Sequence, residues 1–214
     1  MARLQGAAVC YYYPAGDAAA LFAELEARGL KTDRHEHFRG GDAALAASRE
    51  VERDFEFPPD LAVKVIDADT PREFVADVAE LCQSCDVMPV PGSIMRGQVR
   101  TGICLAAIDR DGRVVATASS YMNHHPASSH ATDAFWGMLA TRQDRRGERI
   151  ALLLGAKAIA HMWERHGARG FITGVRANNA SSRALCIKLG VTSTNWIYGE
   201  CMDKELFGGV SLTK

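Results

Sequence analysis

The strongest constraint on the fold is a short arginine-rich turn between two apolar segments. Residues 135–139 form an apolar, strand-like run, and residues 150–163 form an apolar, helix-like run. Between them, Gly147 is surrounded by Arg142, Arg145, Arg146 and Arg149. A strand that turns through Arg-Gly into a helix presents free backbone N–H groups and the positive end of the helix dipole at one place. The turn therefore predicts an anion site, most commonly for a diphosphate, with a solvated helix start as the alternative.

The overall charge indicates that this arginine cluster is a local feature. The 214 residues carry a formal net charge of −1, with 47% hydrophobic and 24% charged residues. This balance is typical of a globular protein with a sizeable core, and it gives no general attraction to nucleic acid or to a membrane. A small polyanion suits the cluster better than a duplex backbone. We therefore expect neither a nucleic-acid partner nor a membrane partner.

The chain shows no targeting or metal-binding pattern. It has no run of about 18 apolar residues, which predicts that no helix spans a membrane. The N-terminal residues lack the charged start, long apolar core and cleavage site of a signal peptide, so we expect a cytoplasmic protein. Cys82 and Cys85 form one C-x-x-C pair, without the second pair that a zinc site needs. We expect reduced thiols and no metal.

The first 60 residues are patterned too regularly for a disordered tail. Two prolines after Phe57 interrupt regular structure, which places a boundary near residue 60. We treat residues 1–60 as an N-terminal extension of a main domain over residues 61–214. The extension either packs a strand and helices beside the main domain or forms the surface of a homodimer, and the sequence leaves both open. The expected elements are a strand over 7–13, a helix over 17–28, a polar turn over 34–41 and a helix over 43–53.

The main domain alternates between strand and helix patterns. Asp111-Gly112 between two strand-like runs is a strong hairpin signal. Several strands followed by a strand–helix–strand–helix–strand order indicate an α+β or mixed α/β sheet with helices on its faces. The expected strands cover 61–66, 101–108, 113–121, 133–141, 170–175 and 194–202, and the expected helices 70–82, 147–165 and 181–189.

Two short motifs follow successive strands of this domain. The Arg-Gly turn runs from Arg146 to Ala151, and a later helix carries Asn179-x-x-Ser182 and then Lys-x-Gly over residues 188–190. Their order and spacing resemble the GNAT superfamily of acyl-CoA N-acyltransferases over roughly residues 61–202. In that family the first motif reads Gln/Arg-x-x-Gly-x-Gly/Ala, so Arg149 stands where a glycine is usual. The second motif has a tyrosine where this chain has Cys186.

The resemblance implies a mostly antiparallel central sheet and acetyl-CoA as the acyl donor. In the family, backbone N–H groups of the turn hold the CoA pyrophosphate, and pantetheine pairs with the freed edge of the fourth strand. That edge corresponds here to residues 138–141, and the fifth-strand region over 175–179 should face it. The cofactor-binding residues implied are Leu139, Ala140, Thr141, Arg146, Gly147, Glu148, Arg149, Ile150, Ala151, Asn179 and Ser182.

Acyl transfer needs a deprotonated amine, a stabilised thioester oxygen and a leaving thiolate that can be protonated. The resemblance implies that a backbone N–H at Leu139–Ala140 stabilises the thioester oxygen. It also places Cys186 where the family has the acid that protonates the leaving thiolate. A small core residue is the alternative for Cys186. The family's usual fourth-strand glutamate falls near Gly137, which does not titrate. The upstream candidates for a catalytic base or relay are His124, His125 and Asp133, with solvated loop residues as the alternative.

The sequence therefore predicts an acetyl-CoA-dependent N-acetyltransferase acting on the primary amine of a small molecule or amino acid. A non-catalytic CoA-binding sensor or interaction module is the alternative, favoured by the departures at Gly137, Arg149 and Cys186. A nucleotide-phosphate site of another α/β fold is a third option. Against it, the chain lacks both Gly-x-x-x-x-Gly-Lys-Ser/Thr and a Gly-x-Gly-x-x-Gly after a strand. The pattern does not name the acceptor, because function lies in the pocket rather than in the fold.

Overall fold

The computed structural model describes residues 1–203 and 205. Three consecutive antiparallel strands over residues 102–108, 114–122 and 133–141 form a meander. The predicted hairpin turn is confirmed, because Gly112 adopts a left-handed φ of 79°. The Asp109 carboxylate accepts hydrogen bonds from the backbone N–H groups of Asp111 and Arg113 and so holds this turn closed. Short-range turn chemistry of this kind is readable from sequence, because all its partners lie within five residues.

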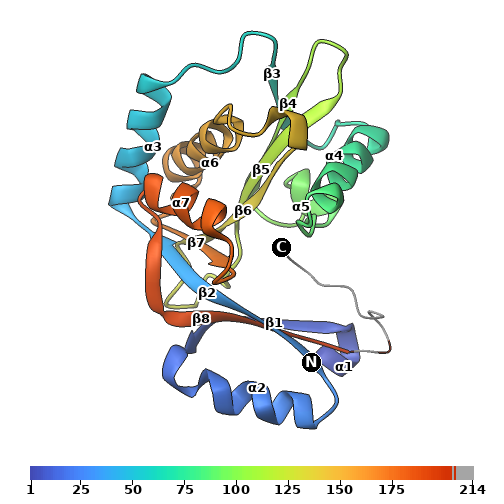
Figure 1. Ribbon diagram of the computed structural model, residues 1–214, viewed down its shortest axis with the longest axis vertical. Coiled ribbons are helices and arrows are strands. Elements are labelled where there is room, and N and C mark those ends of the chain that lie inside the picture. The colour runs from blue at the N-terminus through green and yellow to red at the C-terminus, as the bar shows by residue number, and fades with distance from the viewer. Residues whose placement is uncertain (204, 206–214) are drawn as a thin grey trace.

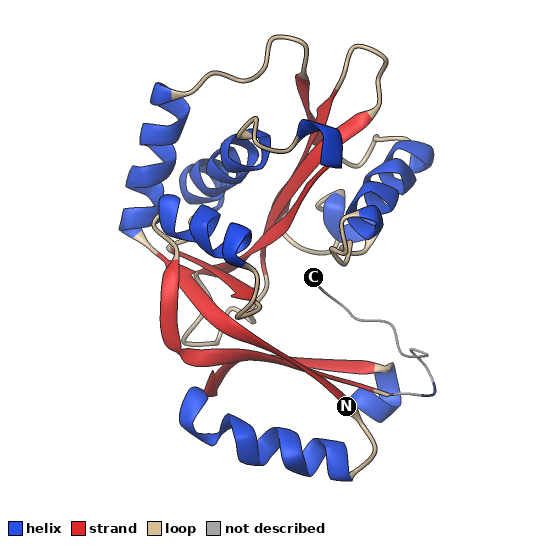
Figure 2. Ribbon diagram, viewed as in Figure 1, coloured by secondary structure: helices blue, strands red, loops and turns tan. Residues whose placement is uncertain are grey.

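The described strands form one eight-stranded sheet with helices on both faces (Figures 1 and 2). Their order is β1-β8-β2-β7-β6-β5-β4-β3. Neighbouring strands pair antiparallel except β6 and β7, which are parallel. The predicted mixed, mostly antiparallel sheet is therefore confirmed. The strands are β1 (Ala7–Pro14), β2 (Lys31–Gly40), β3 (Ala62–Ile66), β4 (Gly102–Ile108), β5 (Val114–Met122), β6 (Asp133–Thr141), β7 (Gly170–Val175) and β8 (Thr192–Met202).

Helices α3 and α6 cover one face of the sheet, and α4 covers the other. On the α6 face, Trp136 is fully buried and its Nε1 donates to the Gly155 carbonyl at 3.1 Å. A Cβ at Gly155 would lie 2.9 Å from the Trp136 ring, so only glycine allows this approach. The helices are α1 (Ala2–Gln5), α2 (Ala18–Ala27), α3 (Asp42–Asp54), α4 (Arg72–Ser84), α5 (Gly92–Met95), α6 (Ile150–His166) and α7 (Ala180–Lys188), with short 3-10 turns at Ala15–Asp17 and Gln143–Arg145.

The polar turn expected over residues 34–41 is wrong: this segment belongs to β2, which lies between β7 and β8. Three charged side chains of β2 meet opposite charges from other elements. Arg39 pairs with Asp133, Glu36 with Arg183, and Asp33 with Arg176. The polarity of the segment therefore reflects ion pairing inside the fold rather than an exposed turn.

Residues 1–60 thus contribute two strands to the sheet, and β1 lies at its edge beside β8. Helix α2 packs on this part of the sheet through Phe22, which shares a small core with Ile197 of β8. Because side chains alternate along a strand, Ile197 points away from the face that carries Tyr198. Helix α2 therefore does not cover the second face of β2 and β8, which carries Tyr198.

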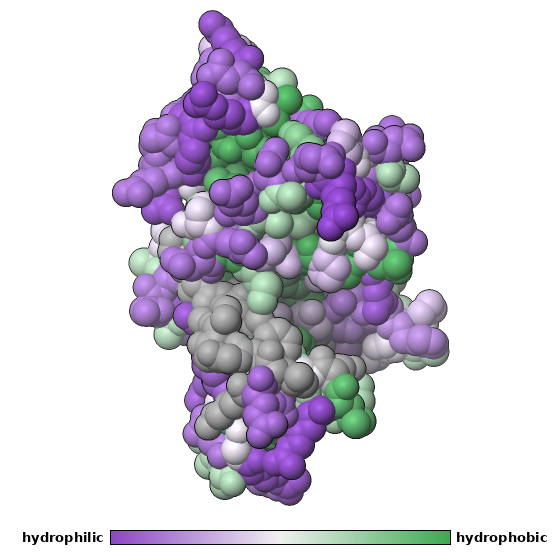
Figure 3. All heavy atoms as spheres, turned by 90° about the vertical axis from the view of Figure 1, so that its right-hand side faces the viewer, coloured by the Kyte–Doolittle hydropathy of each residue, from purple (hydrophilic) through white to green (hydrophobic). Residues whose placement is uncertain are grey.

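Seen from the α4 side, hydrophilic side chains cover most of the described surface, with smaller hydrophobic areas between them (Figure 3). No helix among the described residues is long and apolar enough to cross a membrane.

Candidate active site

Strands β6 and β7 run side by side only at their beginnings. Their pairing covers Asp133 to Phe135 on β6 and Gly170 to Ile172 on β7, and it stops there. Further along β6, Met138 has a left-handed φ of 54°, and the register between β5 and β6 shifts between Thr117 and Ser119. A left-handed residue with a side chain carries local strain, which is typical of functional segments. The remaining edge of β6 is therefore free of β7.

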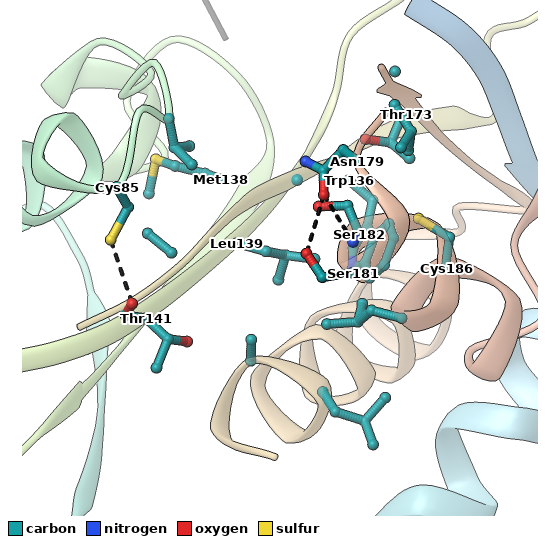
Figure 4. A pocket seen from close by; sticks show the side chains of 18 of the residues that line it. Cys85, Trp136, Met138, Leu139, Thr141, Thr173, Asn179, Ser181, Ser182 and Cys186 are labelled. Atoms are coloured by element: carbon teal, nitrogen blue, oxygen red, sulfur yellow. Dashed lines mark hydrogen bonds between the residues drawn. The ribbon is translucent and has the colours of Figure 1, made fainter. Parts of the chain in front are cut away.

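A cavity of about 470 Å³ lies beside this free edge, bordered by β6, the start of α6, β7 and α7 (Figure 4). Every cofactor-binding residue that the sequence predicted contributes to its lining except Glu148. The residues brought together are Leu139, Ala140, Thr141, Arg146, Gly147, Arg149, Ile150, Ala151, Asn179 and Ser182.

The turn into α6 presents backbone donors to this cavity. Gly147 and Arg149 have left-handed φ angles of 86° and 62°, and no side chain caps the start of α6. Left-handed residues in a tight turn direct successive N–H groups into one concave site that suits an anion. The Arg149 guanidinium lies over the Phe55 ring, 4.8 Å from its centroid. Arg149 thus adopts the backbone conformation that favours glycine and carries its side chain away from the turn.

The arginine cluster is not a set of four equivalent cations. Arg145 donates to both carboxylate oxygens of Asp60, at 2.8 and 3.2 Å, and also to Glu148. Arg142 pairs with Asp109 and Asp144. These two arginines hold the turn in place. Glu148, which is absent from the cavity lining, is occupied by Arg145.

Helix α7 enters the cavity wall at its capping residue. The Asn179 Oδ1 accepts from the Ser182 backbone N–H at 3.1 Å and from the Ser181 hydroxyl at 3.0 Å (Figure 4). Asn179 therefore has a structural role as a cap in addition to lining the cavity. About two helical turns further on, Cys186 also faces the cavity. Burial raises the pKa of the Cys186 thiol to about 12, so the thiol stays protonated at neutral pH.

The candidate bases at the start of β6 and in the loop before it lie outside the cavity lining. Asp133 is buried and accepts hydrogen bonds from Arg39 and Tyr12. Burial alone would raise its pKa, but these bonds outweigh it and hold the pKa below its usual range. Burial lowers the pKa of His124, which keeps this ring neutral. The exposed His125 accepts from the Ala127 N–H at 3.1 Å.

The far end of the cavity is formed by residues that the sequence did not single out as site residues. His35 of β2 and Tyr198 of β8 both contribute to the lining and are both buried, with ring centroids 5.4 Å apart. Thr173 and Gly174 of β7 border them. The signal was present in the alternation of Trp196, Tyr198 and Glu200, which places these three side chains on one face of a strand.

Comparison with known proteins assigns this fold and site to a family. A model described as the acetyltransferase (GNAT) family matches residues 77–191, which is more than half of the chain. The protein therefore belongs to the GNAT family of acetyltransferases. No curated protein matches the sequence.

Several solved structures share the fold at low sequence identity. A Drosophila protein superposes with a TM-score of 0.61 at 16% identity, over 92% of this chain and 60% of its own. A tandem GNAT protein from the clavulanic acid biosynthesis pathway superposes with a TM-score of 0.59 at 18% identity, over 86% of this chain and 58% of its own. A GCN5-related N-acetyltransferase from Kribbella flavida superposes with a TM-score of 0.56 at 16% identity, over 87% of this chain and 63% of its own. The chain thus spans about three fifths of the length of these solved proteins, and the likeness concerns the fold.

Proposed function

We propose that the protein transfers an acetyl group from acetyl-CoA to a primary amine of a small molecule or amino acid. The observation that carries this proposal is the single cavity that joins the free edge of β6 to the uncapped start of α6. An extended strand edge and a concave set of N–H donors are complementary to a ligand with an amide-bearing arm and a diphosphate. Membership of the acetyltransferase family supports the same ligand.

In this proposal the two ends of acetyl-CoA bind to different elements of the fold. The pyrophosphate lies against the turn at Gly147 and the first turn of α6. The amides of the pantetheine arm pair with the β6 edge, which brings the thioester toward Leu139 and Ala140. Binding to backbone groups tolerates Arg149 in place of glycine, because every non-proline residue keeps its N–H. The cavity beyond β6, toward Tyr198, is left for the amine.

The chemistry follows from these positions. A neutral amine attacks the thioester carbon, and the oxygen gains negative charge beside a backbone N–H at Leu139–Ala140. The nitrogen then loses a proton, which passes to solvent or to the thiolate, as the carbon–sulfur bond breaks and CoA leaves. Cys186 stands at the position of the family's proton donor, but burial raises the pKa of its thiol to about 12, so in this proposal the thiolate leaves without a proton from Cys186. A cytoplasmic setting and a small-molecule partner belong to the same proposal, and cell fractionation with metabolite profiling of a deletion strain tests them.

A non-catalytic CoA sensor is the second candidate. It is favoured by Gly137 on β6, where a carboxylate would serve as base, and by the ion pairing that occupies Asp133. The two candidates share the CoA site and differ in turnover. Binding of acetyl-CoA without release of the CoA thiol in the presence of amines would favour the sensor.

The first experiment measures thermal stability with and without about 1 mM acetyl-CoA, with ATP and NAD as control ligands. A ligand present at 100 times its dissociation constant adds about 2.7 kcal/mol to the folded state, which shifts the melting temperature by several degrees. We expect a shift with acetyl-CoA and CoA and little with ATP or NAD. No shift with acetyl-CoA would refute both candidates and leave the arginine turn as an ordinary helix start.

A further inference from the structure

A chain of buried polar side chains leads away from the amine end of the cavity. Tyr198, which borders the cavity, is hydrogen-bonded to the Glu200 carboxyl group and to the Tyr11 hydroxyl. Tyr11 in turn bonds to Asn123. The Tyr11 and Tyr198 rings meet edge to face, 4.8 Å between centroids. The Tyr198 hydroxyl thus stands between the cavity and a carboxyl group that does not itself line it.

Glu200 has an unusual environment for a carboxyl group. It is only 4% exposed, and its Oε2 has no hydrogen-bond partner among the described residues. A buried carboxylate oxygen without a partner is costly, and protonation relieves that cost. Burial raises the pKa of Glu200 to about 7. Glu200 is therefore a buried acceptor with an open oxygen that can take up a proton near neutral pH.

The charged and titratable groups around Glu200 do not return its pKa to the ordinary value. On β8 it faces Tyr198, on β1 Tyr11, and on β2 Asp33, while Arg176 lies in the segment after β7. Asp33 raises the pKa of Glu200 and Arg176 lowers it, and these two residues are paired with each other. Burial raises the pKa of the Tyr198 hydroxyl well above its ordinary value, so Tyr198 remains a neutral hydroxyl.

We propose that Glu200 is the terminal proton acceptor of acetyl transfer, reached from the cavity through the Tyr198 hydroxyl. The amine nitrogen forms its bond to the thioester carbon and releases a proton to the Tyr198 oxygen. Tyr198 passes its own proton to Glu200, and the carbon–sulfur bond breaks with its electron pair leaving on the CoA thiolate. Glu200 returns the proton to solvent or thiolate before the next cycle. This inference rests on the proposed function.

The structure distinguishes Glu200 from the bases expected near β6. Asp133 is held as a carboxylate by Arg39 and Tyr12, and it does not border the cavity. A base is effective when its pKa lies near the working pH and the proton can reach it. Glu200 satisfies the first condition by burial and the second through Tyr198.

The test compares the full-length wild type with Glu200→Gln, Tyr198→Phe and the control Glu164→Gln, an exposed residue of α6. The assay is release of the CoA thiol from acetyl-CoA with glycine, ethanolamine, putrescine and glucosamine between pH 5.5 and 9. We expect kcat to fall about 100-fold or more in Glu200→Gln and Tyr198→Phe, with the acetyl-CoA dissociation constant near wild type and cooperative unfolding retained. Glu164→Gln should match the wild type.

The pH profile separates a proton acceptor from a structural residue. In the wild type, kcat/KM should rise with a midpoint near pH 7, and Glu200→Gln should lack this rise. If Glu200→Gln keeps wild-type activity, or loses activity but keeps the pH profile of the wild type, Glu200 is not the proton acceptor. The proposed transferase activity would be unaffected by either result. If the wild type binds acetyl-CoA but releases no CoA thiol with any of the four amines, the proposed transferase activity is overturned. The role of Glu200 in that activity is then overturned as well.

Discussion

Gly174 and Tyr198 are packed so closely that a Cβ at position 174 would lie 2.9 Å from the tyrosine ring. The same Cβ would come within 3.0 Å of the His35 Cβ. We therefore expect Gly174→Ala to push both side chains out of place at the amine end of the cavity. Overpacking of this kind costs about 1–3 kcal/mol. Thiol release should fall more than acetyl-CoA affinity, as measured by turnover assays and calorimetry.

Gly16→Ala is the matched control for this change. A Cβ at Gly16 would meet no atom within 4 Å, so the variant should keep wild-type stability and turnover. Equal turnover in Gly174→Ala and wild type would show that the Tyr198 position is not critical.

Gly147→Pro should abolish acetyl-CoA binding. Proline removes a backbone N–H from the turn and fixes φ near −65°, whereas Gly147 has a φ of 86°. We expect a loss of at least about 100-fold in affinity, measured by calorimetry, because the pyrophosphate then lacks its concave donor site. Gly112→Pro disturbs a hairpin turn with a φ of 79° away from the cavity and serves as control. Unchanged affinity in Gly147→Pro would refute the phosphate site.

Much of the main domain was predictable because its signals are local. The hairpin depends on Asp109 and Gly112, and the Arg-Gly turn depends on residues within one strand–helix junction. Such patterns fix φ angles and donors without help from distant residues. The two short motifs also carry the GNAT resemblance, and that resemblance implied the ten predicted residues that border the cavity.

Strand β2 was missed because its partners are remote in the sequence. Arg39 meets Asp133 at a separation of 94 residues, Asp33 meets Arg176 at 143, and Glu36 meets Arg183 at 147. A charged segment looks like a turn until these partners are known. The amine end of the cavity was missed for the same reason, since His35 and Tyr198 become neighbours only when β2 lies beside β8.

Cys186→Ala should leave acetyl-CoA affinity intact and change kcat by less than about threefold. A thiol with a pKa of about 12 is a much weaker acid than an ordinary cysteine thiol, which titrates near 8.5, so it does not readily protonate the leaving thiolate. The variant should lose about 1 kcal/mol of stability, because a buried sulfur atom is removed. A fall of about 100-fold in kcat at unchanged affinity would instead establish Cys186 as the acid.

Two substitutions separate the structural and binding roles of Asn179. Asn179→Ala removes the acceptor for the Ser182 N–H and should cost about 1 kcal/mol in stability. Asn179→Asp keeps that acceptor and should preserve stability, while its negative charge beside the proposed ligand weakens acetyl-CoA binding. Both variants should lose activity, and only the first should lose stability. A fully active Asn179→Asp would limit Asn179 to capping α7.

Glu200 also predicts an unusual dependence of stability on pH. Its pKa is raised from 4.5 to about 7 in the folded protein, so the folded state holds this proton more tightly than the unfolded state. Between these two pH values the unfolded state binds fewer protons, and the free energy of unfolding therefore falls as the pH rises. A shift of this size corresponds to about 3 kcal/mol, lost progressively up to pH 7 and constant above it.

Glu200→Gln removes this contribution while the other titrating groups remain. In urea unfolding between pH 5 and 8, the variant should gain stability relative to the wild type as the pH rises to 7, and the difference should then level off. Glu164→Gln, a substitution at an exposed residue of α6, is the control for this series. A constant difference in Glu200→Gln would mean that the buried carboxyl group titrates normally. The same substitution is thus expected to remove the proton acceptor and to raise the stability relative to the wild type as the pH increases.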